Sequence, residues 1–263
     1  MAESVEVLCV TMHQTDFSKY EEMNLSSDVV FANQADRTAF EQTTLHGHCA
    51  KMITTETRGV GRNRNLALLY AQGDILLFAD DDVRYQDDYV ENVQRVYARH
   101  PDADMIVFSI EYTKNGTVFP GKSNRDGRMG LMGSLKNGTC VFSVRRKSLE
   151  KANIWFSTLF GCGTEYAHGE DTLFLLAARR NMRVYGSSYS LGCCAKDVST
   201  CFWGYNDRYF YDQGVLYAAA FGRLAYPMAL QFCIRKRGKY RDQMTLRAAV
   251  KQMRKGIVHY GCS

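Results

Sequence analysis

Proline and long apolar runs are what this 263-residue sequence has least of. Three prolines are too few for long disordered linkers between domains. The most apolar segment, 215–234, is interrupted by Arg223 and Pro227, whereas a membrane-spanning helix needs about 20 consecutive apolar residues. We therefore expect one large domain, or a domain with a small appendage, and no transmembrane segment.

The cysteines lack the spacing of metal and redox sites. Nine are present without a Cys-x-x-Cys pair, and Cys193, Cys194 and Cys201 have poor spacing for zinc. The count is odd, the chain is long, and no signal peptide is visible. We therefore expect reduced, mostly buried cysteines in a cytoplasmic protein.

Charge is unevenly distributed along a chain whose total is +5. Residues 235–255 hold nine Lys or Arg against Asp242, a local charge of +8, which leaves −3 for the rest. A basic segment beside an apolar one is typical of attachment to an anionic membrane surface. No nucleic-acid-binding motif is present and the aromatic residues are not interleaved with the basic run, so we expect no nucleic-acid partner.

Polar residues follow the apolar segments in the first half of the chain. We predict strands over 5–11, 28–32, 49–54, 75–79, 105–109 and 139–144. Thr11 ends the first of these segments, His13 follows it closely, and Asn33 follows the second. Such polar strand ends are expected where a nucleotide lies on a parallel sheet, although each one alone is also typical of an ordinary loop.

Three carboxylates end the apolar segment 75–79. Asp80, Asp81 and Asp82 are like charges in close proximity, so one of them stays protonated or a cation neutralises the group. Mg²⁺ and Mn²⁺ are often held by one or two carboxylates together with substrate phosphates. The run therefore indicates a metal and diphosphate site, and the alternative is a solvated acidic turn before the next helix.

A glycine-led helix is predicted over 59–71. Its first turn would present free N–H groups and a positive dipole end, both suited to phosphate. Arg62 and Arg64 lie in that turn, where a cation is unfavourable unless an anionic ligand or an acidic partner accompanies it. The alternative is that both are surface arginines.

A second carboxylate centre precedes the helix predicted over 172–180. It consists of Glu170 and Asp171 after Gly169, with His168 beside them and further glycines upstream that permit close backbone approach. Acidic residues at a helix start also occur simply as partners of the helix dipole, which is the alternative interpretation.

The remaining segments complete the predicted organisation. Further helices are predicted over 17–23, 87–99, 145–152, 215–234 and 244–254. Residues 112–137 form a long polar stretch that is a candidate acceptor or lid loop. Residues 185–211 are interpreted as a substrate-binding lid or as an irregular packed segment.

The order of these motifs resembles glycosyltransferase family 2, the inverting nucleotide-sugar transferases with the GT-A fold. The resemblance covers about residues 5–185 and depends most on Gly-Asp-Ile-Leu-Leu-Phe-Ala-Asp-Asp-Asp after Gly-Arg-Asn-Arg-Asn. It implies an α/β fold with a Rossmann-like, mostly parallel sheet flanked by helices. Residues 1–211 would be the catalytic domain, its nucleotide-sugar half at about 1–110 and its acceptor half at about 111–211, and residues 212–263 a helical basic extension.

The family resemblance also implies roles for individual residues. Asp81 and Asp82 would hold a divalent metal, Mn²⁺ or Mg²⁺, and Asp80 would contact the ribose. Asp171 resembles the catalytic base and Glu170 is its neighbour. The remaining nucleotide-sugar-binding candidates are Thr11, His13 and Asn33 near the uracil loops and Arg62 facing the diphosphate.

The implied activity is transfer of a sugar, with inversion, from a UDP-sugar to a saccharide acceptor. We expect an acceptor linked to undecaprenyl diphosphate, in bacterial capsule, O-antigen or exopolysaccharide synthesis. The enzyme would work at the inner face of the cell membrane, to whose anionic surface residues 235–255 would attach it. A non-catalytic saccharide- or partner-binding protein on the same scaffold is one alternative, and a sugar-1-phosphate nucleotidyltransferase is another.

Overall fold

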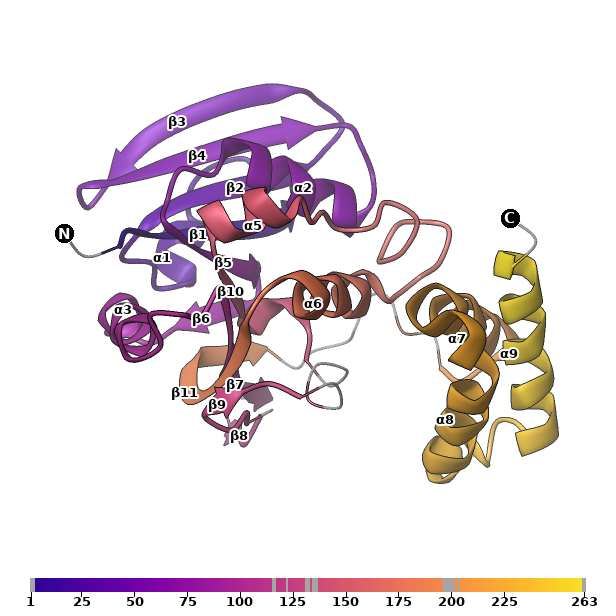
Figure 1. The fold of residues 1–263 in the computed structure, drawn as a ribbon. Coiled ribbons are helices and arrows are strands. Elements are labelled where there is room, and N and C mark those ends of the chain that lie inside the picture. The colour runs from indigo at the N-terminus through magenta and orange to yellow at the C-terminus, as the bar shows by residue number, and fades with distance from the viewer. Residues whose placement is uncertain are drawn as a thin grey trace.

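The computed structural model describes residues 3–114, 117–121, 123–130, 133, 137–195, 202 and 204–261 (Figure 1). The strands are β1 Val5–Met12, β2 Asp28–Gln34, β3 Ala39–Leu45, β4 His48–Thr55, β5 Ile75–Asp80, β6 Val83–Tyr85, β7 Met105–Lys114, β8 Thr117–Phe119, β9 Gly127–Arg128, β10 Phe142–Arg145 and β11 Val184–Ala195. The helices are α1 Lys19–Glu22, α2 Val60–Tyr70, α3 Tyr89–Arg99, α5 Arg146–Ala152, α6 Glu170–Asn181, α7 Asp207–Phe221, α8 Ala225–Tyr240 and α9 Leu246–Gly261, with short 3₁₀ turns at Thr139–Val141 and Gly222–Leu224.

One mixed sheet carries the N-terminal part of the molecule. Its strand order is β3-β4-β2-β1-β5-β10-β7-β11-β6, with β8 and β9 paired to β7 and β11. Strands β4, β2, β1 and β5 are parallel, so their carboxyl ends meet at one edge. Strand β10 is antiparallel to β5 and β7. The parallel half therefore places the ends of β1, β2 and β5 beside one another, as expected for a ligand site.

Helices cover the sheet and exclude water from a continuous apolar core. Helix α2 packs on β1 and β2, α5 on β10, and α3 against β1 and β11 (Figure 1). Strand β5 is buried along Ile75–Ala79, which explains why its sequence is an uninterrupted apolar run. That run ends at Asp80, where the chain emerges at the ligand edge.

Three segments differ from the sequence-based predictions. Strand β3 was not expected, because its seven residues include few apolar side chains and it lies at the edge of the sheet. The interpretation of 185–211 as a lid or irregular segment is wrong for Val184–Ala195, which is a strand between β7 and β6. Positions 196–201 and 203 of that interpretation lie outside the described residues, as do parts of the predicted 112–137 loop. The loop prediction is wrong for the end of β7 and for β8 and β9, which are strands.

The predicted helix over 215–234 is two helices. Gly222 has a φ of 53° and ends α7, and α8 begins three residues later. Pro227 lies in the first turn of α8, where a missing N–H costs little. Within the described residues, no helix is long and apolar enough to cross a bilayer.

Six of the seven cysteines within the described residues are free, as expected, and the seventh is not. Cys162 is disulfide-bonded, so the expectation that the cysteines are reduced is wrong for this residue. Free thiols are found at Cys9, Cys49, Cys140, Cys193, Cys194 and Cys233. Spacing alone did not reveal the exception, because disulfide partners need not be close in sequence.

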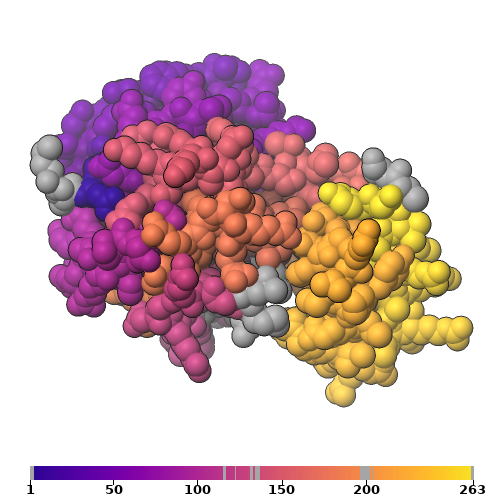
Figure 2. Space-filling view, in the orientation of Figure 1, coloured from indigo at the N-terminus to yellow at the C-terminus, as the bar shows by residue number. Residues whose placement is uncertain are grey.

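Helices α7, α8 and α9 form a lobe beside the sheet domain (Figures 1 and 2). The lobe has its own apolar core around Phe210, Phe232 and Met253. Two glycines allow α7 and α9 to touch along their backbones. A Cβ at Gly214 would lie 2.1 Å from the Met253 carbonyl oxygen, and a Cβ at Gly256 would lie 2.1 Å from the Tyr211 carbonyl oxygen.

We expect Gly256→Ala to lower the free energy of unfolding by about 1–3 kcal/mol, because the added methyl group forces α7 and α9 apart. Urea denaturation followed by far-ultraviolet circular dichroism measures the loss. Gly238→Ala in α8 is the matched control, since nothing lies within 4 Å of its Cβ position. It should be neutral or raise stability by up to about 1 kcal/mol through helix propensity. Equal effects of the two changes would contradict this account of the helix contact.

Candidate active site

The strand ends form a connected polar edge. Thr11 of β1 lies opposite Asn33 of β2, and its hydroxyl donates to Asp81 Oδ2 at 2.8 Å. Asn33 is fully buried, donates to the hydroxyl of Thr54 at 3.0 Å, and exchanges two hydrogen bonds with the backbone of Gln14. Asn33 therefore fixes the loop after β1, and Thr11 fixes the first turn after β5.

The start of α2 is held against the same edge. Gln34 Oε1 accepts a hydrogen bond of 3.0 Å from the N–H of Gly59, the residue before the helix, whose φ is 113°. Asn63 is buried and donates to the Ala32 carbonyl at 2.6 Å. These contacts anchor the first turn of α2 beside the ends of β1 and β2.

Arg64 joins the two carboxylate centres. This arginine is 5% exposed, donates to Asp80 Oδ1 at 2.8 Å through one terminal nitrogen, and donates to Glu170 Oε1 at 2.7 Å through the other. The Phe156 ring lies 5.5 Å from its guanidinium carbon. Burial disfavours the charge, but the two carboxylates outweigh burial, so the pKa of Arg64 is raised above its usual value.

Arg62 and His13 differ from Arg64 in being exposed. The Arg62 side chain donates a 3.4 Å hydrogen bond to the carbonyl of Arg58, one turn earlier. Unlike Arg64, it forms no ion pair with an acidic residue in the described part of the chain. His13 has a φ of 55°, and its backbone N–H donates to the Gln34 carbonyl at 2.8 Å. Both side chains therefore lie at the surface of the edge, accessible to a ligand.

The strand-end aspartates, Asp80–Asp82, have three different environments. Asp80 binds Arg64 while its side chain stays 42% exposed. Asp81 accepts from Thr11. The thiol of Cys194 donates to Asp82 Oδ2 at 3.2 Å. The pKa of Asp82 is raised, first because the surrounding protein displaces water from it, and further because Asp80 and Asp81 carry like charge.

These residues can hold only part of a metal's coordination shell. Within the described residues, no three His, Cys, Asp or Glu side chains are grouped so that they could bind a metal by themselves. Mg²⁺ and Mn²⁺ commonly keep one or two protein carboxylates and take their other ligands from water and substrate phosphates. Asp81 and Asp82 fit that pattern, since neither is committed to an ion pair in the described structure.

The α6 carboxylates, Glu170 and Asp171, lie in the first turn of α6. Glu170 is buried and bound by Arg64. Asp171 is partly exposed, accepts from the Thr172 N–H at 2.6 Å, and faces Gly138, where a Cβ would lie 3.7 Å from Asp171 Oδ2. Glu170 is thus buried in an ion pair, whereas the side chain of Asp171 stays partly exposed.

Upstream glycines make this arrangement possible, as the sequence suggested. Gly161 has a φ of 111°, and a Cβ there would lie 2.9 Å from Glu170 Oε2 and 2.6 Å from a methyl carbon of Val60. Gly169 has a φ of 116°, and a Cβ there would lie 2.6 Å from Leu216 of α7. Any larger residue at either position would push the α6 carboxylates away from α2 or from the helical lobe.

Sequence reasoning named the two carboxylate centres and noted that Arg64, a cation in the first turn of a helix, needs an acidic partner or an anionic ligand. It did not predict that Arg64 joins the two centres, and the alternative of a surface arginine is wrong for this residue, which is buried. Asn63 and Gln34, which position the same turn, had no such signal. Their hydrogen-bond partners, the Ala32 carbonyl and the Gly59 N–H, are far from them in sequence and become neighbours only in the folded chain.

Comparison with known proteins places this geometry in a family. A family model described as "Glycosyl transferase family 2" matches residues 29–165. No curated protein matches the chain.

Solved structures of TarS from S. aureus are similar in fold. TarS 1–349 in complex with UDP-GlcNAc is 16% identical, with a TM-score of 0.64, over 98% of this chain and 89% of that chain. Its complex with UDP is 17% identical, with a TM-score of 0.61, over the same shares of both chains. TarS 1–349 alone is 17% identical, with a TM-score of 0.60, over 91% of this chain and 73% of that chain.

We expect Arg64→Met to lower the free energy of unfolding by about 3–5 kcal/mol, because it leaves the buried Glu170 carboxylate and Asp80 without a counter-charge. Chemical denaturation measures the change. Arg62→Met is the matched control in the same helical turn, and since Arg62 is exposed its effect should stay within about 0.5 kcal/mol. A loss for Arg64→Met no larger than for Arg62→Met would show that the bridge is not stabilising.

Proposed function

Because the chain belongs to glycosyltransferase family 2 and has the GT-A fold, we propose that it transfers a sugar from a nucleotide-diphosphate sugar to a saccharide acceptor. The family and the fold class, both expected from the sequence, are confirmed. The observation that carries the proposal is the Arg64 bridge, which joins Asp80 of the candidate leaving-group site to Glu170, the neighbour of the candidate base Asp171. A single displacement needs a group that stabilises the leaving group on one side of the anomeric carbon and a base on the other side.

For the donor we propose a UDP-sugar. The supporting observations are the similarity of this fold to TarS structures titled as complexes with UDP and UDP-GlcNAc, and the polar edge itself. In this proposal Thr11, His13 and Asn33 surround the uracil, Asn33 acting through the Gln14 loop that it fixes. Asp80 contacts the ribose, and the exposed Arg62 faces the diphosphate.

A divalent metal, Mn²⁺ or Mg²⁺, is proposed to be held by Asp81 and Asp82 together with the donor diphosphate. When bound, it would supply positive charge to the leaving nucleoside diphosphate, a contribution of several kcal/mol in metal-assisted reactions. Thr11 orients Asp81 toward this task through its hydrogen bond. Arg62 would add a second cation on the same side.

Asp171 is the proposed catalytic base. The acceptor hydroxyl oxygen attacks the anomeric carbon, the bond from that carbon to the diphosphate oxygen breaks, and the hydroxyl proton passes to Asp171. The electron pair leaves with the nucleoside diphosphate, so one displacement inverts the configuration. Glu170 holds the start of α6 in place through Arg64 and does not itself need to take up the proton.

For the acceptor we propose a saccharide linked to undecaprenyl diphosphate, used in bacterial surface-polysaccharide synthesis at the inner membrane face. The helical lobe supports attachment to such a surface. Tyr226, Leu230 and Ile234 of α8 are exposed at intervals of four residues and thus share one helix face. The first basic residues of 235–255, up to Lys239, continue the same helix, and those from Arg247 onward lie in α9. We also propose that the catalytic domain ends before α7. The boundary expected from the sequence, residue 211, lies inside this helix, which is continuous there.

Metal-dependent nucleotide binding is the first expected result. With Mn²⁺ present, UDP at 100 times its dissociation constant should stabilise the protein by about 2.7 kcal/mol in a thermal-shift assay. GDP, CDP and TDP should stabilise it less. Asp82→Asn should remove the Mn²⁺-dependent part, whereas Asp87→Asn, which changes an exposed aspartate on the other side of β6, should keep it. Stabilisation by UDP that ignores Mn²⁺ would overturn the metal proposal.

Loss of the base should abolish turnover without loss of the donor. Asp171→Asn is expected to slow UDP release from UDP-GlcNAc, UDP-glucose or UDP-galactose, with water as acceptor, by about 10²–10⁴-fold. Calorimetry should find UDP bound as in the wild type. Glu91→Gln, which changes an exposed carboxylate in the first turn of α3, is the control and should leave both values unchanged. Wild-type turnover in Asp171→Asn would exclude Asp171 as the base.

Membrane attachment is tested with vesicles. The full chain should co-sediment with phosphatidylglycerol vesicles and not with phosphatidylcholine vesicles. Changing the exposed Arg235, Arg237 and Lys239 to Gln should weaken binding on the order of 100-fold, since each basic residue contributes about 1 kcal/mol. The same change at Arg99, Lys147 and Lys151, which are exposed on the sheet domain, is the control. Equal losses in both triple variants would refute a specific role of α8.

A further inference from the structure

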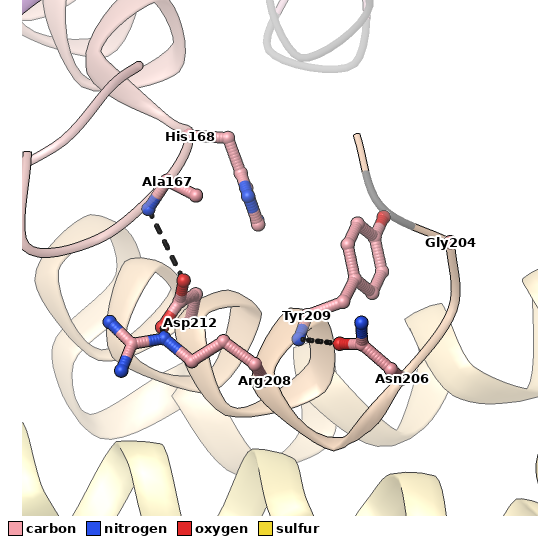
Figure 3. A pocket seen from close by; sticks show the side chains of 7 residues that line it. All are labelled: Ala167, His168, Gly204, Asn206, Arg208, Tyr209 and Asp212. Carbon is pink, nitrogen blue, oxygen red and sulfur yellow. Dashed lines mark hydrogen bonds and ion pairs between the residues drawn. The ribbon is translucent and has the colours of Figure 1, made fainter. Parts of the chain in front are cut away.

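A cavity lies between the loop before α6 and the start of α7 (Figure 3). Its volume is about 150 Å³, room for about five water molecules at about 30 Å³ each. Ala167 and His168 line it from the loop before α6, and Asn206, Arg208, Tyr209 and Asp212 line it from the start of α7. Its exposed lining is more apolar than polar, and the proposed base, Asp171, is not part of it.

His168 enters this cavity with a nitrogen that lacks a partner. Its Nε2 is buried and forms no hydrogen bond with the described part of the chain. The ring points toward α7 and stacks on Tyr209 with centroids 5.2 Å apart (Figure 3). Burial lowers the pKa of His168, so the neutral ring offers one donor and one acceptor nitrogen. A buried polar atom of this kind needs a partner, and a hydroxyl group can serve either tautomer.

The charges around the cavity cancel. Asp212 is fully buried, accepts from the Ala167 N–H at 3.2 Å, and pairs with Arg208 at 2.8 Å. Arg208 also donates to the carbonyl of Glu165. The arginine is therefore committed to acceptors within the protein, which leaves no uncompensated positive charge for an anion. A neutral ligand with hydroxyl groups matches this lining better than a phosphate does.

We propose that this cavity binds one uncharged sugar ring of the acceptor, with a hydroxyl group of the sugar on His168 Nε2. The inference rests on the proposed function and deepens it, because it assigns a position for the acceptor. His168 and Asp171 are three positions apart in the sequence, so their Cα atoms lie within about 11 Å of each other. Gly169, packed against Leu216, fixes the chain between them. A saccharide held at His168 would thus extend toward the base.

The test uses the full chain labelled with ¹⁵N-histidine, which has six imidazole signals. The signal missing from His168→Asn identifies His168. Glucose, galactose, N-acetylglucosamine and inorganic phosphate are then titrated separately in the presence of UDP and Mg²⁺, which is diamagnetic and does not broaden the signals. We expect a saturable shift of the His168 nitrogens with at least one sugar and none with phosphate. No saturable shift with any sugar, or a shift with phosphate alone, would overturn the proposal.

Two further variants separate a binding role from a structural one. Tyr209→Leu removes the stacked ring while His168 remains observable, and the sugar dissociation constant should rise at least tenfold. His46→Asn changes an exposed histidine paired with Glu21 and should leave that constant unchanged. Sugar binding unaffected by Tyr209→Leu would contradict the assignment of the ligand to this cavity.

UDP titration of the same samples distinguishes the two levels of the proposal. If UDP binds and no sugar shifts His168, the acceptor assignment fails and the proposed function stands. If neither UDP nor any UDP-sugar binds, the proposed function fails, and with it the assignment that rests on it. His168→Asn should bind UDP as the wild type does, since the contacts of His168 all lie toward α7.

Discussion

A single buried guanidinium determines how the two halves of the candidate site are arranged. Arg64 cannot be buried alone, because an uncompensated charge in the protein interior costs several kcal/mol. Asp80 ends a strand and Glu170 starts a helix 90 positions later, and both must stay near Arg64 to neutralise it. The bridge therefore fixes β5 relative to α6, and with them the carboxylates that the proposed chemistry uses.

Close backbone contacts extend that constraint through the molecule. Gly161 lets the chain pass beside Glu170, and Gly169 lets the start of α6 rest on Leu216 of α7. Helices α7 and α9 then meet at Gly214 and Gly256. A chain of positions without room for a Cβ thus leads from the buried ion pair to the helical lobe. A proposed membrane-facing lobe held this rigidly would present an acceptor to the base at a fixed distance.

Much of the site could be predicted because it follows from strand ends. Asp80–Asp82 terminate an apolar run, and the parallel pairing of β1, β2 and β5 brings the polar residues after those strands together. The burial of one arginine over the other could not be predicted. Arg62 and Arg64 are two residues apart on α2, about 200° around the helix, so one faces inward and the other outward. Only the packing of α2 on the sheet decides which of the two arginines is buried. Edge strand β3 could not be predicted either, because its few apolar residues form no strand pattern.

The electrostatic balance of the site is a further argument for the proposed metal. Asp80–Asp82 and the two α6 carboxylates are five acidic groups in the two centres that one buried cation, Arg64, joins through Asp80 and Glu170. Arg62 adds a second positive charge, but it is exposed and weakened by solvent. A donor diphosphate would bring more negative charge to a region that is already negative. Like charges this close repel strongly unless a cation lies between them. The pKa of Asp82 is raised first because the surrounding protein displaces water from its carboxylate, and further because Asp80 and Asp81 repel its charge. A divalent ion shared by Asp81, Asp82 and the diphosphate would remove both penalties at once.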